Sequence, residues 1–267
     1  MTEAVVARGL ELTYGERVAL AASDFHFPYG AITALIGPNG SGKSTVLAAV
    51  AGLHEPAAGA LTVLGSAPRR VRSRIAFVPQ STKVNDLLPV TVREVVAMGR
   101  YASLGMMGRF GPEDRAALDE ALDRLGLNPL AARHLRELSG GQRQRVFVAQ
   151  GLVQEHDMLL LDEPTTGLDI VSTDVIRQVV ESERADGCAV VITTHDFAEA
   201  RAADHVVLLA NRVVAEGAPD EVFTPEHLAK AYGLEIDSSL DHMDVDDPAH
   251  LPSQRFHRHV EFPPLGD

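Results

Sequence analysis

Residues 37–45 read Gly37-Pro38-Asn39-Gly40-Ser41-Gly42-Lys43-Ser44-Thr45, which is a complete phosphate-binding loop. Its glycines let backbone N–H groups turn inward around phosphates, its lysine reaches the β- and γ-phosphates, and its first serine after the lysine can ligate Mg²⁺. The apolar run 31–36 leads directly into the loop and is predicted to be a strand, and residues 44–52 are predicted to be a helix. This strand, loop and helix predict a nucleotide phosphate site in an α/β domain.

A second apolar run ends in two adjacent carboxylates. Residues 158–161 read Met-Leu-Leu-Leu and are followed by Asp162 and Glu163. At the end of a buried strand, Asp162 would hold a Mg²⁺ ion, and Glu163 would orient or deprotonate an attacking water. Two acids at a strand end are often only solvated. The assignment therefore depends on the phosphate-binding loop in the same chain.

A third motif is the sequence Ser139-Gly140-Gly141-Gln142. Ser139 can cap the helix predicted for residues 142–152, so that free N–H groups and the helix dipole could face a phosphate. A plain helix cap would not require two glycines followed by a glutamine. The motif therefore indicates a second anion-binding element, separate in sequence from the loop at 37–45.

Charge and composition exclude several classes of protein. The net charge of −13 argues against a general nucleic-acid binder, which needs a basic face, and against direct docking on an anionic membrane. The single cysteine, Cys188, cannot form an internal disulfide and lies in an apolar run, so we expect a buried thiol. The start of the chain does not resemble a signal peptide, and no run approaches the roughly 18 apolar residues needed to cross a bilayer.

Hydrophobic spacing divides the rest of the chain. From about residue 91 to 154 the apolar residues follow a helical period, and on either side of this region short apolar runs predict strands. We therefore expect a mostly helical subdomain, about 88–154, inserted into an α/β core. Residues 236–267 are acidic, contain His242, His250, His257 and His259, and are predicted to be a poorly ordered tail. The predicted strands are 4–8, 10–14, 74–79, 158–161, 189–193 and 205–209, and the predicted helices besides 44–52 are 92–98, 113–125, 142–152 and 225–232.

From about residue 4 to 235 the chain resembles the nucleotide-binding subunit of an ATP-binding-cassette (ABC) transporter, because the three motifs occur in the order and at the spacing of that family. The resemblance implies an ABC ATPase domain over residues 1–235. Its fold would be a P-loop NTPase (RecA-like) core with antiparallel β elements and an inserted α-helical subdomain. ATP and Mg²⁺ would be its cofactors, and ATP hydrolysis its activity.

The resemblance also implies roles for single residues. Tyr14 would stack on adenine, Gln80 would contact Mg²⁺ and the attacking water, and His195 would contact the γ-phosphate. The alternatives are that Tyr14 is an ordinary strand aromatic and His195 a structural histidine. Asp169, in Gly167-Leu168-Asp169, would lie at a dimer interface, and Ser139 to Gln142 would meet the γ-phosphate bound by a second copy of the chain. The predicted catalytic residues are Glu163, His195 and Gln80; the predicted nucleotide-binding residues are Tyr14, residues 37–45, residues 139–142 and Asp169; the predicted metal ligands are Ser44, Gln80 and Asp162.

Residues 89–101 and 105–110 resemble the subdomain sequence of importers for metal ions, and the second segment favours the zinc and manganese group. Importers of ferric siderophores or haem share much of this sequence and remain the alternative. The resemblance implies a separate integral membrane permease, an external substrate-binding protein, no nucleic-acid partner, and a peripheral position at the cytoplasmic face of the cell membrane.

ABC-type ATPases without a membrane partner are a further alternative. Those that act on DNA place a very long coiled coil between the phosphate loop and the second motif, and here only about 95 residues intervene. Those that act in translation carry two cassettes in one chain, and this chain has one. The histidines of the tail could bind zinc, but their spacing is not that of a metal site, and a solubilising tail is the simpler interpretation.

Overall fold

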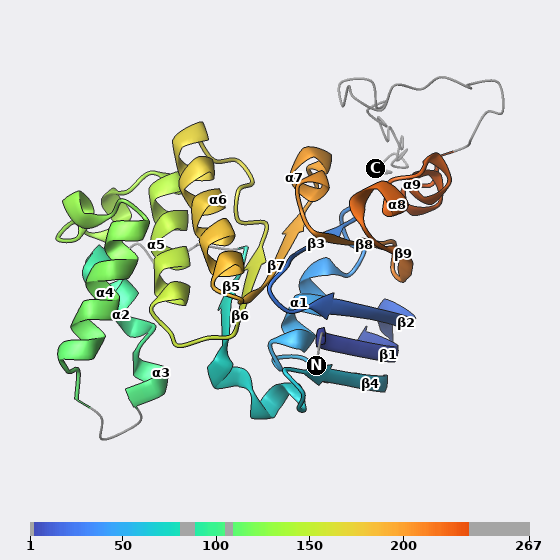
Figure 1. Ribbon diagram of the computed structural model, residues 1–267, viewed down its shortest axis with the longest axis horizontal. Coiled ribbons are helices and arrows are strands. Elements are labelled where there is room, and N and C mark those ends of the chain that lie inside the picture. Colours follow the sequence, from blue (N-terminus) through green and yellow to red (C-terminus); the bar gives the residue numbers. More distant parts are fainter. Residues whose placement is uncertain (1–2, 81–88, 105–108, 235–267) are drawn as a thin grey trace, which may run out of the picture. The chain divides into compact units, whose positions relative to one another are not determined.

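The computed structural model describes residues 3–80, 89–104 and 109–234 (Figure 1). The predictions for the tail at 236–267 and for residues 105–108 lie outside this range. In the described part the strands form two sheets. An antiparallel sheet has the order β2-β1-β4, and a core sheet has the order β5-β6-β7-β3-β8-β9, in which only the β8–β9 pair is antiparallel. The strands are β1 (Glu3–Tyr14), β2 (Arg17–Pro28), β3 (Ile32–Ile36), β4 (Ala58–Val63), β5 (Ile75–Val78), β6 (Met158–Asp162), β7 (Ala189–Thr194), β8 (His205–Leu209) and β9 (Val213–Gly217).

The helices fall into two groups. One group forms a subdomain at one end of the core sheet in Figure 1, within the range predicted for the inserted helices: α2 (Val92–Met98), α3 (Tyr101–Leu104), α4 (Pro112–Arg124) and α5 (Gly140–Leu152). The others belong to the core: α1 (Lys43–Val50), α6 (Ile170–Ala185), α7 (Phe197–Arg201), α8 (Pro219–Val222) and α9 (Pro225–Tyr232). Single 3-10 turns occupy Pro68–Arg70, Arg72–Arg74, Asn128–Leu130 and Leu135–Glu137. Among the described residues no helix has the length and apolar character to cross a membrane.

The core sheet is buried on both faces, and each face packs on different elements. Leu159 and Leu161 of β6 belong to a hydrophobic cluster with α2, α4, α5 and α6. Leu160, between them, belongs to a second cluster with α1 and the antiparallel sheet. Figure 1 shows α1 between the two sheets. Because successive side chains of a strand point to opposite faces, such a strand must be apolar at every position, which explains its continuous apolar sequence.

The N-terminal strands differ from the sequence expectation. Residues 4–8 and 10–14 were expected as two strands, but they form the single strand β1. Its pairing with β2 shifts register between Ala7 and Leu10, where Gly9 has φ +54°. Glycine adopts this left-handed conformation without strain, so the chain passes through an irregularity and continues as the same strand. Strands β2, β4 and β9 and helices α3, α6, α7 and α8 were not anticipated from the sequence.

A buried ion-pair network joins the helical subdomain to the core. Glu183 of α6 lies between Arg124 of α4, whose Nη2 is 2.7 Å from one carboxylate oxygen, and His156, whose Nε2 is 3.1 Å from the other. Burial alone would raise the pKa of Glu183, but the hydrogen bonds from His156 and Arg124 hold it below its ordinary value. Burial alone would lower the pKa of His156, but hydrogen bonds with Cys188 and Glu183 raise it to about 10. Cys188 is buried, as predicted.

We expect Glu183→Ala to lower the free energy of unfolding by about 2–4 kcal/mol at pH 6, because Arg124 and His156 both lose their buried partner. The contribution of ionised Glu183 to the free energy of unfolding is fully present above pH 4.5, and it is lost as the pH falls through the lowered pKa of Glu183 in the folded protein. The His156 contribution is full below pH 6.5 and is lost as the pH rises to about 10. Urea denaturation at about pH 3, pH 6 and pH 10 measures both effects, the first two for Glu183 and the last two for His156.

The matched control is Glu181→Ala on the same helix. Exposed Glu181 pairs only with half-buried Arg184, at 2.9 Å, among the ion pairs of the described chain, so its removal should cost less than about 1 kcal/mol. Equal destabilisation by the two substitutions would contradict the buried network.

Candidate functional site

The phosphate-binding loop connects β3 to α1 and can only be built with glycine at two of its positions. Gly42 has φ +103° and caps α1, and a Cβ atom there would lie 2.6 Å from the backbone oxygen of Ala19. A Cβ atom on Gly37 would lie 2.0 Å from the backbone oxygen of Leu209. Backbone atoms cannot move away as a flexible side chain can. The two glycines therefore let the loop lie directly against β2 and β8.

Lys43, the first residue of α1, is held inside this loop. Its Nζ donates to the backbone oxygens of Gly37 at 2.8 Å and Pro38 at 3.2 Å, and the residue is 6% exposed. Burial lowers the pKa of the ammonium, while the nearby carboxylates of Glu163 and Asp162 act in the opposite direction. The loop thus holds a cation between the turn of its own backbone and the two acids at the end of β6.

Oxygen atoms suited to Mg²⁺ meet beside this lysine. Ser44 Oγ donates to Asp162 Oδ1 at 3.2 Å, and Thr193 Oγ1 donates to the same oxygen at 2.6 Å. Asp162 of β6 pairs with Thr193 of β7 in the core sheet, which brings the hydroxyl to the carboxylate. A hydroxyl and a carboxylate are the hard oxygen donors that Mg²⁺ prefers. The donor set therefore fits the ion that the sequence predicts.

Glu163, the residue after Asp162, has a strained backbone conformation and lies close to two other predicted site residues. Its φ of +48° is unusual for a residue other than glycine, and its backbone N–H donates to Thr193 Oγ1 at 2.8 Å. Gln80 Nε2 donates to Glu163 Oε2 at 2.7 Å, and His195 Nδ1 lies 3.9 Å from that oxygen. The three predicted catalytic side chains thus lie together at the carboxyl ends of β5, β6 and β7.

The motif at 139–142 belongs to a second cluster. Ser139 caps α5: its Oγ accepts from the backbone N–H of Gln142 at 3.3 Å, and its own N–H donates to Gln142 Oε1 at 3.0 Å. Asp169 caps α6 by accepting from Ser172 N and Oγ at 2.8 and 2.9 Å, and these hydrogen bonds lower its pKa. A Cβ atom on Gly141 would lie 2.6 Å from Asp169 Oδ2, so this glycine allows the two helix starts to touch.

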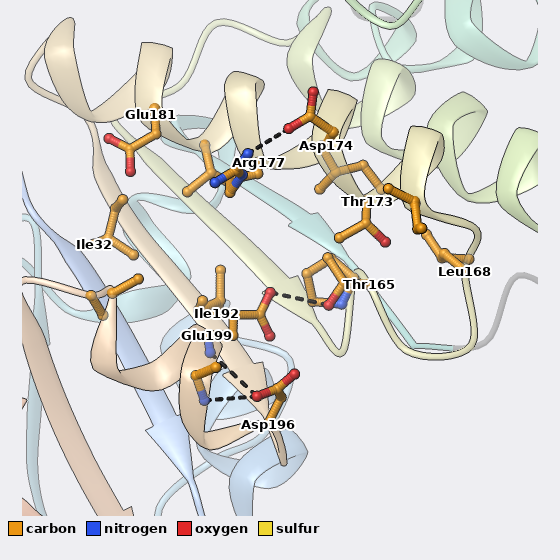
Figure 2. A pocket seen from close by; sticks show the side chains of 17 residues that line it. Ile32, Thr165, Leu168, Thr173, Asp174, Arg177, Glu181, Ile192, Asp196 and Glu199 are labelled. Atoms are coloured by element: carbon orange, nitrogen blue, oxygen red, sulfur yellow. Dashed lines mark hydrogen bonds and ion pairs between the residues drawn. The ribbon is translucent and has the colours of Figure 1, made fainter. Parts of the chain in front are cut away.

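A groove of about 520 Å³ lies between α6, α7 and the loop that follows β6 (Figure 2). Thr165 Oγ1 donates to Glu199 Oε1 at 3.0 Å across it, as Figure 2 shows. None of residues 37–45 lines this groove. Beside it, the first turn of α6 exposes Ile170 and Val171, whose exposed fractions are 88% and 66%. The groove and these apolar side chains thus adjoin Asp169 rather than the phosphate-binding loop.

Tyr14 ends β1 with 55% of its surface exposed, and its ring centroid lies 4.6 Å from that of His54. His54, Thr193 and Asn211 were not singled out from the sequence. Asn211 supports the loop, since its backbone N–H donates to Ser41 O at 3.1 Å and its Nδ2 to Gly40 O at 3.2 Å. An asparagine between two strands does signal a turn, but no local pattern shows which segment the turn will contact.

Comparison with known proteins agrees with this geometry. A family model described as ABC transporter matches residues 20–166. The chain is 41% identical to the zinc transport system ATP-binding protein TroB of Treponema pallidum, over 89% of this chain and 90% of that protein. It is 36% identical to the manganese transport system ATP-binding protein MntB of Halalkalibacterium halodurans, over 87% and 93%. A solved metal-chelate type ABC transporter in an inward-facing conformation matches with a TM-score of 0.76 and 30% identity, over 87% of this chain and 90% of that one.

The family model covers more than half of the chain, and the two relatives match 89% and 87% of it. The fold is likewise that of the solved ABC ATPases, with a parallel core sheet, an antiparallel sheet and a helical subdomain. This agreement extends from the phosphate-binding loop to both carboxylates at the end of β6. The chain therefore belongs to the ABC transporter family and is a nucleotide-binding ATPase of that family.

Proposed function

We propose that the chain is the ATP-hydrolysing subunit of an importer for a divalent metal ion, zinc or manganese, and that it drives a separate membrane permease from the cytoplasmic face. The observation that carries the proposal is the convergence of Lys43, Asp162 and Glu163 at one edge of the core sheet. The names of the relatives, which are zinc and manganese transport ATP-binding proteins, support the choice of cargo.

In the proposed mechanism, the loop at 37–45 binds the phosphates of ATP through its backbone N–H groups, and Lys43 turns its ammonium from Gly37 and Pro38 toward the β- and γ-phosphates. Ser44 and Asp162, with Gln80, would hold Mg²⁺, which when bound neutralises charge on these phosphates. Tyr14 would stack on the adenine. These residues bind and orient the nucleotide, and they leave proton transfer to Glu163.

Glu163 would orient the attacking water and accept its proton. The hydrogen bond from Gln80 and the bond between the Glu163 backbone and Thr193 fix the direction of the carboxylate. His195, 57% exposed and 3.9 Å from Glu163, would contact the γ-phosphate. A carboxylate that is held in place before the water arrives has no orientational freedom to lose at the moment of reaction.

A second copy of the chain would complete each site. The start of α5 presents backbone N–H groups and a helix dipole, which favour a phosphate. Within its own subunit this helix start contacts Asp169 and Ser172. Exposed Ile170 and Val171 beside Asp169 favour a protein interface there, because apolar side chains in the first turn of a helix gain from being covered. Two copies would close head to tail around two ATP molecules.

The permease would contact the helical subdomain. Met98 at the end of α2 and Tyr101 at the start of α3 are exposed by 41% and 58%, and Gln80, which follows β5, donates to Glu163. An external substrate-binding protein would deliver the metal to the permease. The solved metal-chelate transporter supports a second candidate cargo, a ferric siderophore or haem, on the same machinery.

Uptake of radioactive zinc, manganese and siderophore-bound iron tests the cargo. In cells that lack this chain, the wild-type protein should restore zinc or manganese uptake, and Glu163→Gln should restore none. Restoration of siderophore-iron or haem uptake alone would replace the metal-ion proposal with the second candidate. If no uptake depends on the chain and no integral membrane protein copurifies with it, the transport role is wrong.

A further inference from the structure

Four side chains that ligate metals well meet where the antiparallel sheet joins the edge of the core sheet. Glu3 comes from β1, His26 from β2, His205 from β8 and Glu216 from β9. We call them the interstrand cluster. In Figure 1, β9 and β2 lie beside one another, and the hydrogen bond from the backbone N–H of His26 to Glu216 Oε2, at 3.1 Å, joins them directly. The cluster shares no residue with the nucleotide site.

The ligand atoms converge to the separations found around a single ion. One atom each from His26, His205 and Glu216 lie within 4.8 Å of one another. His26 Nδ1 and Glu216 Oε1 are 3.3 Å apart, and the two imidazole ring centroids are 4.7 Å apart. Glu3 lies on the other side of the His26 ring, with Oε2 3.8 Å from Nε2. A carboxylate there favours a proton on Nε2, which leaves Nδ1 free to act as a ligand.

Two atoms of the cluster are buried without a hydrogen bond in the described structure. His205 is only 7% exposed, and its Nε2 makes no hydrogen bond in the described structure. Glu3 Oε2 is also buried without a hydrogen bond there. A buried polar atom without a hydrogen bond destabilises the folded protein, so a cluster with two such atoms is poorly explained as a plain structural contact. Burial, and then the neighbouring His26, lower the pKa of His205, which favours the neutral ring that ligates metals.

We propose that His26, His205 and Glu216 bind one divalent transition-metal ion of the zinc class, with Glu3 positioning His26. Two imidazole nitrogens and a carboxylate oxygen are a common ligand set for zinc and leave one position for water. Imidazole disfavours Mg²⁺ and Ca²⁺, which prefer oxygen ligands. Because its ligands come from β2, β8 and β9, the ion would tie the antiparallel sheet to the core sheet. The site is additional to the Mg²⁺ of the proposed ATPase reaction and does not depend on the transported cargo.

A second group, His156, Glu183 and Cys188, also places ligand atoms within 4.8 Å of one another. Here Glu183 is already paired with Arg124 and His156, so a cation and two hydrogen bonds occupy the carboxylate. This group therefore serves as the internal comparison for the interstrand cluster.

Thermal unfolding of the full-length, nucleotide-free protein with and without Zn²⁺ tests the site. An ion that binds only the folded protein, at about 100 times its Kd, should raise the Tm of the wild type by about 5–10 °C. Mn²⁺ at the same concentration should give a smaller rise, since it binds such ligands more weakly. Cys188→Ser should keep the full rise with Zn²⁺.

Glu216→Gln keeps an oxygen that can accept from the His26 backbone but removes the anionic ligand, and His205→Gln removes the buried imidazole. Both substitutions should nearly abolish the rise in Tm, and either one suffices if the other variant does not fold. The histidines of the tail are unchanged in every variant, so binding there cannot produce the difference. A wild type without a rise, an equal rise in both variants, or a rise lost in Cys188→Ser would each overturn the proposal.

Discussion

Glu163→Gln is expected to lower kcat for ATP hydrolysis by about 10²–10⁴-fold while leaving ATP binding intact, because the amide cannot accept a proton from the attacking water. The substitution keeps the shape of the side chain, and the hydrogen bond from the Glu163 backbone N–H to Thr193 remains. Lys43, Ser44 and Asp162 are unchanged. Phosphate release, measured beside binding of a fluorescent ATP analogue, separates the chemical step from binding.

The same variant should accumulate as a dimer on a sizing column in ATP and Mg²⁺, because the nucleotide that joins the two copies is no longer consumed. Glu226→Gln, an exposed acid in the first turn of α9, is the matched control and should behave as wild type. Wild-type turnover in Glu163→Gln would remove Glu163 from its proposed role. A specific ATPase rate that stays constant as the wild-type protein is diluted through the dimer range would contradict the shared site.

Lys43→Ala should lower kcat/KM by about 10²–10³-fold and also weaken ATP binding, since the ammonium contacts the phosphates in both the ground state and the transition state. The loss of activity should be larger than removal of one positive charge would cause, because Lys43 also donates to Gly37 and Pro38 and so supports the loop itself. Lys43→Arg should not restore activity, since a planar guanidinium does not fit a site shaped around the compact ammonium of a lysine that is only 6% exposed.

Lys230→Ala is the control, because Lys230 is an exposed lysine in the last turn of α9 and its removal changes the net charge equally. Phosphate release and ATP affinity of this variant should match the wild type. If Lys43→Ala retained wild-type ATP affinity, the loop at 37–45 would not be the phosphate site.

The sequence predicted the parts of the fold whose requirements are local. Strands β6, β7 and β8 were predicted to within one residue, because burial on both faces demands an unbroken apolar run. Strand β4 was not predicted because only Leu61 and Val63 of its residues are buried, so the alternation covers too few residues to indicate a strand. Helix α6 did carry a signal, since its buried positions 172, 176, 179, 180 and 183 follow the helical period after a capping aspartate.

The site residues also fall into those that local sequence predicts and those that it does not. The loop at 37–45 and the acids at 162 and 163 could be proposed from the residues, because the residue types within each motif are enough to indicate its backbone conformation and its chemistry. The positions of Gln80 and His195 beside Glu163 could not, because they depend on the order of β5, β6 and β7 in the sheet; only the family resemblance suggested them. Thr193 shows the limit most clearly. It reaches Asp162 through a strand register that no local sequence encodes.

The contact between Gly141 and Asp169 has a mechanical consequence. The start of α5 lies against the cap of α6 so closely that a methyl group on Gly141 would meet Asp169 and Ser172, so a shift of one helix start would press on the other. Asp169 is joined to Glu163 by only the five residues 164–168. In the proposed dimer, the start of α5 would contact the nucleotide of the second copy. A shift of that helix start would therefore be passed through Asp169 to Glu163 of its own copy.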